Sequence, residues 1–92
     1  MTHQIYIDTW IHLDGLPHQD GIIMTTKQAR KKVVDDIKKL GLEANVRTIP
    51  SKDLFKIIFN NQEDVNLFIL INGLKKFENE EYDNYFTWYE YP

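Results

Sequence analysis

Apolar and polar residues alternate along residues 4–14 almost without a break. Because successive side chains on a β-strand point to opposite faces, this alternation predicts a strand with one face against a core. The predicted core set is Ile5, Ile7, Thr9, Ile11 and Leu13, and the opposite set is Tyr6, Asp8, Trp10 and His12. The opposite set holds a tyrosine and a tryptophan, and exposed aromatic residues of this size indicate a binding surface.

The segment that begins at Thr25 has the signals of a helix at both ends. Thr25 and Gln28 form a capping-box pattern, in which each side chain accepts a hydrogen bond from a free backbone N–H. Apolar residues then recur about every fourth position, at Ala29, Val33, Ile37 and Leu40. Gly41 is predicted to end the helix, because the position after the C-cap favours a positive φ, and Leu42 takes the usual place of the accompanying hydrophobic contact.

The rest of the chain predicts three strands and a second helix. The strands are expected at residues 42–49, 54–60 and 85–91, with a turn at Pro50 between the first two and an acidic connector, residues 78–84, before the last. Residues 61–77 fit either a buried strand that ends in a hairpin turn at Asn72 and Gly73, or a helix capped by Asn61.

The helix is favoured for residues 61–77 because acidic residues lie in its first turn and lysines in its last, which matches the helix dipole. These residues are Glu63 and Asp64 at the start, and Lys75 and Lys76 at the end. In this interpretation Gly73 lies inside the helix, where it costs about 1 kcal/mol relative to alanine.

The predicted order is β-α-β-β-α-β, which is the ferredoxin-like, split βαβ arrangement of the α+β class. With right-handed crossovers, both helices cover one face of a four-stranded antiparallel sheet whose spatial order is last, first, third, second. The other face of the sheet is expected to be open. A chain of 92 residues, 42% of them hydrophobic, is expected to form a single domain, residues 1–92.

The open face and the acidic connector are the predicted binding surfaces. The last strand contributes Tyr85, Tyr89 and their neighbours in one register, and Phe86, Trp88 and Glu90 in the other. The predicted binding residues are Tyr6, Trp10, His12, Tyr85 and Tyr89 on the sheet, and Glu80, Glu81 and Asp83 in the connector. Aromatic residues from two adjacent strands form a contiguous patch of the kind that marks interaction sites.

The charge distribution favours a protein partner. The net charge is −3, and residues 57–92 alone carry two basic and seven acidic residues, a balance of −5. An acidic connector is expected to fit a basic groove on another protein. Small acidic domains rich in aromatic residues are common among phage-encoded inhibitors of host proteins, which is an analogy of composition. The first functional hypothesis is therefore a non-catalytic module, an inhibitor or adaptor, that binds another protein or itself as a homodimer.

The second hypothesis is binding of single-stranded nucleic acid. Ile5, Tyr6 and Ile7 form an apolar–aromatic–apolar triplet that is similar to the short motif of the RNA-recognition-motif family. This resemblance implies a sheet whose first and third strands stack bases. It covers these three residues, and the family's longer motif is not matched, because residues 52–59 lack its glycine and paired aromatic residues and turn Lys56 and Ile58 outward.

Nothing in the sequence is typical of an enzyme, and no cofactor is expected. The chain has no cysteine, its one serine lies in a proline turn, and its four glycines form no phosphate-binding loop. His12, Asp14, His18 and Asp20 have side chains that suit zinc or manganese, so a small metal-dependent enzyme is the third hypothesis, although exposed loop residues are the favoured interpretation. No segment approaches the ~20 apolar residues of a membrane helix, and no secretory leader is recognised, so a cytoplasmic location is expected.

The first predicted helix is also rich in basic residues, namely Lys27, Arg30, Lys31, Lys32, Lys38 and Lys39. Asp35 and Asp36 follow Lys31 and Lys32 by four residues, which places opposite charges side by side on a helix. This spacing predicts that the basic cluster is partly neutralised and forms a solvated face.

Overall fold

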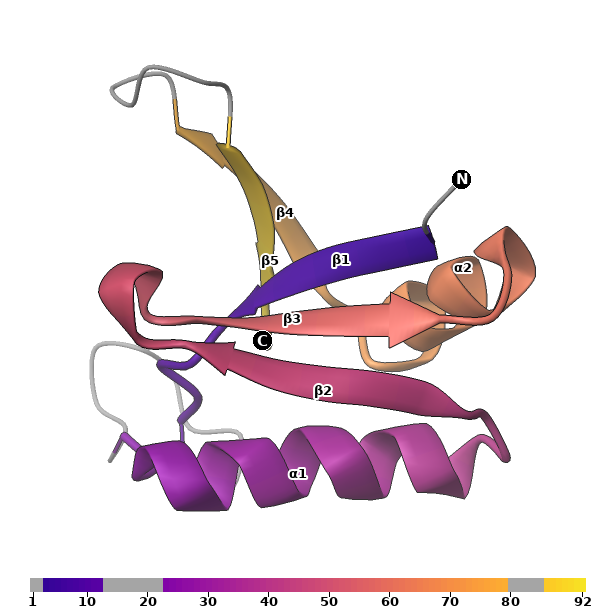
Figure 1. Ribbon diagram of the computed structural model, residues 1–92, viewed down its shortest axis with the longest axis horizontal. Helices are drawn as coiled ribbons and strands as arrows, with labels where there is room; N and C mark the ends of the chain where they lie inside the picture. The colour runs from indigo at the N-terminus through magenta and orange to yellow at the C-terminus, as the bar shows by residue number, and fades with distance from the viewer. Residues whose placement is uncertain (1–2, 13–22, 80–85) are drawn as a thin grey trace.

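The computed structural model describes residues 3–12, 23–79 and 86–92 (Figure 1). Along the chain, the elements are β1 (His3–Asp8), α1 (Thr26–Lys39), β2 (Ala44–Ile49), the short 3-10 helix η2 (Pro50–Lys52), β3 (Leu54–Phe59), α2 (Gln62–Ile71), β4 (Lys75–Asn79) and β5 (Phe86–Glu90). The fold is therefore α+β, with a five-stranded sheet and two helices, as the sequence predicts at the level of class.

The sheet is mixed and has the order β2-β3-β1-β5-β4. The four strands predicted from the sequence occupy the expected order, but the expectation of a four-stranded antiparallel sheet is wrong. A fifth strand, β4, precedes β5 and pairs antiparallel with it along the sheet edge. Because this additional strand reverses the chain once more, β5 lies beside β1 in the parallel direction, with Ile7 opposite Tyr89.

Gly73 explains why the additional strand was not predicted. Its φ of 61° is left-handed, so it ends α2 instead of lying within it. The Gly73 N–H donates to the Leu70 carbonyl at 3.2 Å, and the Leu74 N–H donates to the Ile69 carbonyl at 3.0 Å. These two bonds form a Schellman motif, which ends the helix, and β4 begins two residues after Gly73. The helix prediction for residues 61–77 is thus confirmed at its start and wrong at its end.

The predicted boundaries of α1 are confirmed in detail. Thr25 Oγ1 accepts from the Gln28 N–H at 3.2 Å, and Gln28 Oε1 accepts from the Thr25 N–H at 3.0 Å, which completes the capping box. At the other end, Gly41 has a φ of 69°, and the N–H of Leu42 donates to the Ile37 carbonyl at 3.2 Å. The same C-terminal motif therefore closes both helices.

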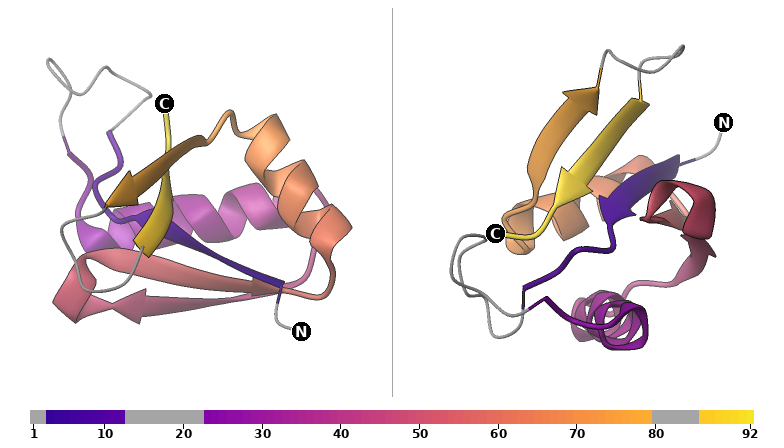
Figure 2. Two further views of the ribbon diagram at one scale, coloured as in Figure 1. Left: turned by 90° about the horizontal axis from the view of Figure 1, so that it is seen from above. Right: turned by 90° about the vertical axis from the view of Figure 1, so that its left-hand side faces the viewer.

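The core lies between the helices and one face of the sheet. Figure 2 shows, in its left view, α1 and α2 on the same side of β2 and β3. The core residues are Ile5, Ile7, Ile11, Ala29, Val33, Ile37, Val46, Phe55, Ile57, Phe59, Val65, Phe68 and Tyr91. Phe59 of β3 and Phe68 of α2 join sheet to helix, with ring centroids 5.4 Å apart. Both helices use this face, and no helix among the described residues covers the other face of the sheet.

Candidate functional site on the open face of the sheet

Strand register places five side chains at neighbouring positions on the open face, one from each strand. Ile5, Ile7 and Ile57 are buried on the core side, so the residues between them point the other way. In the antiparallel pairs, Tyr6 lies opposite Lys56, Lys56 opposite Arg47, and Phe77 opposite Trp88. The parallel pairing of Ile7 with Tyr89 places Tyr6 beside Trp88. We call Arg47, Lys56, Tyr6, Trp88 and Phe77, in this spatial order from β2 to β4, the cross-strand row.

The aromatic end of the row is held by local contacts. The Phe77 and Trp88 rings stack across β4 and β5, with centroids 6.1 Å apart and planes inclined by 15°. Lys75 Nζ lies 5.9 Å from the Phe77 centroid. The Trp88 indole N–H donates to Glu90 Oε1 at 3.4 Å. These contacts position the rings, and the side chains of both Phe77 and Trp88 stay half-buried, so part of each ring remains accessible.

The basic end of the row consists of Arg47 and Lys56. Neither side chain makes a hydrogen bond or an ion pair with any residue among those that the structure describes. Asp8 and Glu90 also lie on this face and have other partners, since Asp8 Oδ1 accepts from the Trp10 backbone N–H at 2.8 Å and Glu90 accepts from the indole of Trp88. The row thus joins two cations to three aromatic rings.

The binding residues predicted from the sequence are only partly brought together. Tyr6 lies on the open face as predicted, where its hydroxyl accepts from Gln4 Nε2 at 3.3 Å. Trp10 follows the end of β1 and is 52% exposed, but it stands outside the row. Tyr89 packs against the core, so its placement on the open face is wrong. The register found is the alternative one, which contributes Trp88.

His12 is also misplaced by the strict alternation of residues 4–14. β1 ends at Asp8, and the Thr9 N–H turns to donate to the Asp53 carbonyl at 3.0 Å. Beyond this point Ile11 and His12 are both buried, with His12 only 4% exposed, so His12 does not belong to an exposed binding face. The remaining predicted binding residues, Tyr85, Glu80, Glu81 and Asp83, lie outside the described residues.

The metal hypothesis concerns residues that are mostly outside the described part of the chain. Of its four candidates, His12 is buried, whereas Asp14, His18 and Asp20 are not described. Within residues 3–12, 23–79 and 86–92, no three histidine or acidic side chains converge into a candidate metal centre.

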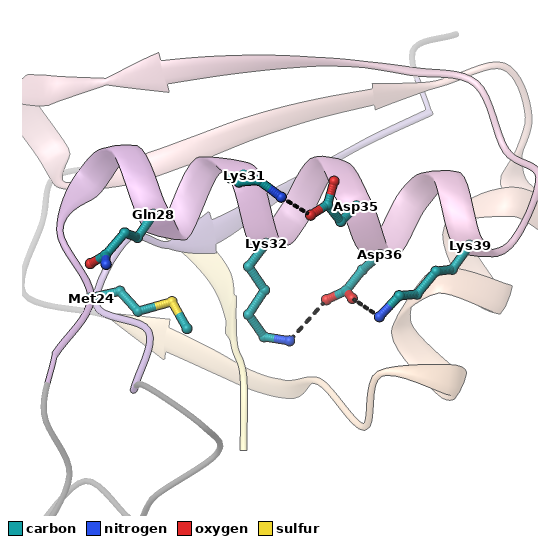
Figure 3. A pocket seen from close by; sticks show the side chains of 7 residues that line it. All are labelled: Met24, Gln28, Lys31, Lys32, Asp35, Asp36 and Lys39. Atoms are coloured by element: carbon teal, nitrogen blue, oxygen red, sulfur yellow. Dashed lines mark hydrogen bonds and ion pairs between the residues drawn. The ribbon is translucent and has the colours of Figure 1, made fainter.

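The basic cluster on α1 is partly neutralised as predicted, because three of its six basic residues are paired with aspartates (Figure 3). Lys31 Nζ lies 2.7 Å from Asp35 Oδ2, and Lys32 Nζ lies 3.2 Å from Asp36 Oδ2. Lys39 Nζ adds a third contact, 3.9 Å from Asp36 Oδ1. These side chains line a cavity of about 270 Å³. Because its lysines are paired with aspartates, this cavity is a weaker anion site than the basic end of the cross-strand row.

Two of the row's residues were missed for identifiable reasons. The sequence predicts Phe77 inside a helix, whereas α2 ends six residues earlier, and no sequence signal marks the outer face of the strand that carries Arg47. The signal for Phe77 was present, since Gly73-Leu74 repeats the Gly41-Leu42 pattern that correctly ended α1.

Comparisons with known proteins found no match for this chain. No family model matches the chain, and neither a curated protein nor a solved structure matches it significantly. Both helices in the described part of the chain are too short or too polar to cross a membrane.

Proposed function

We propose that this protein is a non-catalytic binding module whose cross-strand row holds a single-stranded nucleic acid. The observation that carries the proposal is the continuity of the row, in which two cations and three aromatic rings occupy adjacent strands. Single strands are bound by this combination, because bases stack on aromatic faces while cations neutralise the phosphates. Sheets with accessible aromatic side chains also suit splayed bases.

The size of the row fits a short stretch of nucleic acid. Neighbouring strands lie about 4.8 Å apart, so five strands place the ends of the row roughly 19 Å from each other. Tyr6, Trp88 and Phe77 offer stacking surfaces over two of the four intervals, and Arg47 and Lys56 extend the site toward β2. A ligand of a few nucleotides therefore covers the row from its aromatic end to its basic end.

The overall charge sets the expected strength and selectivity. The net charge of −3 disfavours duplex binding, which relies on the neutralisation of many phosphates. Binding to a single strand is expected to be of modest affinity and sensitive to salt, with stacking as its main favourable contribution. A protein partner, the first hypothesis from the sequence, is the alternative outcome of the test.

The test follows the emission of Trp88 during titration with mixed-sequence single-stranded RNA and DNA at low salt. A Trp10→Phe background removes the other tryptophan, which stands outside the row. Saturable quenching is expected. Tyr6→Ala is expected to weaken binding roughly 5- to 150-fold, as the loss of one stacked base would.

Lysine variants separate the row from the general charge of the protein. Lys56→Ala is expected to weaken binding and to reduce the slope of log K against log salt by about 0.7, the share of one phosphate contact on a single strand. Lys38→Ala is the matched control, because it removes the same charge from an exposed site on α1. A flat titration, or equal effects of the two lysine variants, would refute the proposal and leave a protein partner as the explanation of the aromatic face.

A further inference from the structure

The outer face of α2 is apolar and uncovered by any described residue. Val65 and Phe68 pack into the core, whereas Leu67, Leu70 and Ile71 are 38%, 77% and 59% exposed. These three residues are spaced by three, four and one positions, so they lie together on one side of the helix. Exposed apolar residues that cluster in this way mark an interaction site more often than isolated ones do.

Opposite charges flank this apolar centre. Glu63, which is exposed, lies one helical turn before Leu67. Lys76, also exposed, lies just beyond the end of α2 in β4. Lys76 pairs with Tyr89, whose side chain packs against the core, so Lys76 points to the side of the sheet that carries α2. Glu63 and Lys76 therefore lie at opposite ends of α2, with the exposed apolar residues between them along the chain.

This order is self-complementary under a twofold axis. An isologous dimer uses the same patch on both subunits, so a residue at one end of the patch meets the residue at the other end of its copy. With the axis near Leu70, two antiparallel α2 helices bring leucine to leucine and acidic end to basic end. We infer that the outer face of α2 binds a second copy of this chain, with the Glu63 end of each helix beside the Lys76 end of the other.

The inferred dimer leaves the cross-strand row exposed. Because α2 covers the core side of the sheet, its outer face points away from the open face. Two copies joined through α2 therefore present two separate open faces. The inference uses none of the residues of the cross-strand row, so it stands or fails independently of the proposed function.

The dimer is expected to dissociate on dilution. A stable interface buries about 800 Å² on each partner, which is more than a single helix face of this length supplies. We therefore expect the mass to rise with concentration from the 11.0 kDa of one chain toward twice that value. Sedimentation velocity over a wide concentration range measures this rise directly and needs no nucleic acid.

Variants test which surface is used. Leu70→Glu is expected to give a monomer at every concentration, while its circular dichroism and melting stay unchanged because Leu70 is exposed. Glu63→Lys and Lys76→Glu are each expected to weaken the dimer several-fold by placing like charges together. The double variant, in which both charges are reversed, is expected to restore it. Glu43→Lys and Lys38→Glu are the matched controls on exposed sites away from α2.

Three results would overturn the inference. The first is a wild-type mass that stays at one chain over the whole range. The second is a dimer that persists in the Leu70→Glu variant, which would place the interface on another surface. The third is a double charge reversal that fails to restore association, because self-pairing through α2 requires that rescue.

Discussion

Substitution of Gly73 by alanine distinguishes the structure from the helix predicted by the sequence. In the structure, Gly73 ends α2 with a φ of 61°. A left-handed conformation costs an L-residue about 1–2 kcal/mol. Alanine also lowers the conformational entropy of the unfolded chain, which stabilises the folded state by roughly 0.4–1 kcal/mol. The expected net result is a loss of about 1 kcal/mol in the free energy of unfolding.

No steric clash adds to this expected loss in the free energy of unfolding, because a Cβ at Gly73 would meet no described atom within 4 Å. If Gly73 instead lay inside a helix, alanine would stabilise the protein by about 1 kcal/mol. The two interpretations therefore differ in the sign of the effect. Gly41→Ala is the matched comparison, since Gly41 has a φ of 69°, an equally open surrounding and the same hydrogen-bonded motif.

Urea denaturation followed by far-ultraviolet circular dichroism measures the effect. With a slope of about 1–3 kcal/mol per molar urea, a loss of 1 kcal/mol lowers the midpoint by about 0.3–1 M. Gly73→Asn is expected to lose less, because asparagine tolerates the left-handed region better than alanine does. A midpoint that rises in Gly73→Ala would refute the assignment of Gly73 as the end of α2.

Three further predictions concern the core, the cap and alkaline pH. Phe68→Ala is expected to lower the free energy of unfolding by about 3–5 kcal/mol, because the Phe68 ring is wholly buried against Phe59. Leu70→Ala on the same helix is expected to change it by less than about 0.5 kcal/mol, because Leu70 is exposed. Equal losses of the two variants in urea denaturation would contradict the packing. Thr25→Ala removes the Oγ1 that caps α1 and is expected to cost about 1 kcal/mol in the same assay, so an unchanged midpoint would contradict the cap. Burial, and then the charge of Asp36, raises the pKa of Tyr91 above its ordinary value of 10.0. Folding therefore favours the protonated phenol of Tyr91. The resulting stabilisation of the folded state is complete below pH 10 and is lost progressively as the pH rises above 10. Tyr91→Phe should flatten the fall of stability above pH 10, and an unchanged slope would refute this cause.

The parts of the fold that local signals determine were predictable from the sequence. The capping box of Thr25 and Gln28, the end of α1 at Gly41 and the cap of α2 at Asn61 all depend on residues close in sequence. The alternation of β1 correctly identified Ile5 and Ile7 as core residues. These features need no information about the rest of the molecule, because each is set by backbone conformation and side-chain periodicity.

The parts that depend on competition between local signals were not predictable in the same way. Lys75 and Lys76 match the dipole at the end of a longer helix, and this signal favours helix up to residue 77. Gly73-Leu74 is the competing signal, which ends the helix earlier. Once β4 was missed, the direction of β5 was missed with it, since one additional strand reverses the chain. The register of β5, and hence the choice between Tyr89 and Trp88 for the open face, depends on its parallel contact with β1, which no local pattern of the sequence encodes.

His12 illustrates a third limit. Its position in an alternating run places it on the exposed face only as long as the strand continues. In the structure the strand ends at Asp8, and the isolated bridge between His12 and Ile23 lies beyond that point. The burial of His12 thus follows from where the strand stops, and the hydrogen bond from Thr9 to Asp53 that accompanies this end joins residues 44 positions apart.

The most direct test of the proposed function is a nuclear magnetic resonance titration of isotope-labelled protein with a short single-stranded RNA. We expect the largest shifts at the Trp88 indole N–H and at the backbone amides of Tyr6, Lys56 and Phe77, whereas the amides of α1 and of the outer face of α2 change little. Shifts that centre on the helices, or the absence of shifts at ligand concentrations that saturate a weak site, would contradict the claim that the cross-strand row binds single strands.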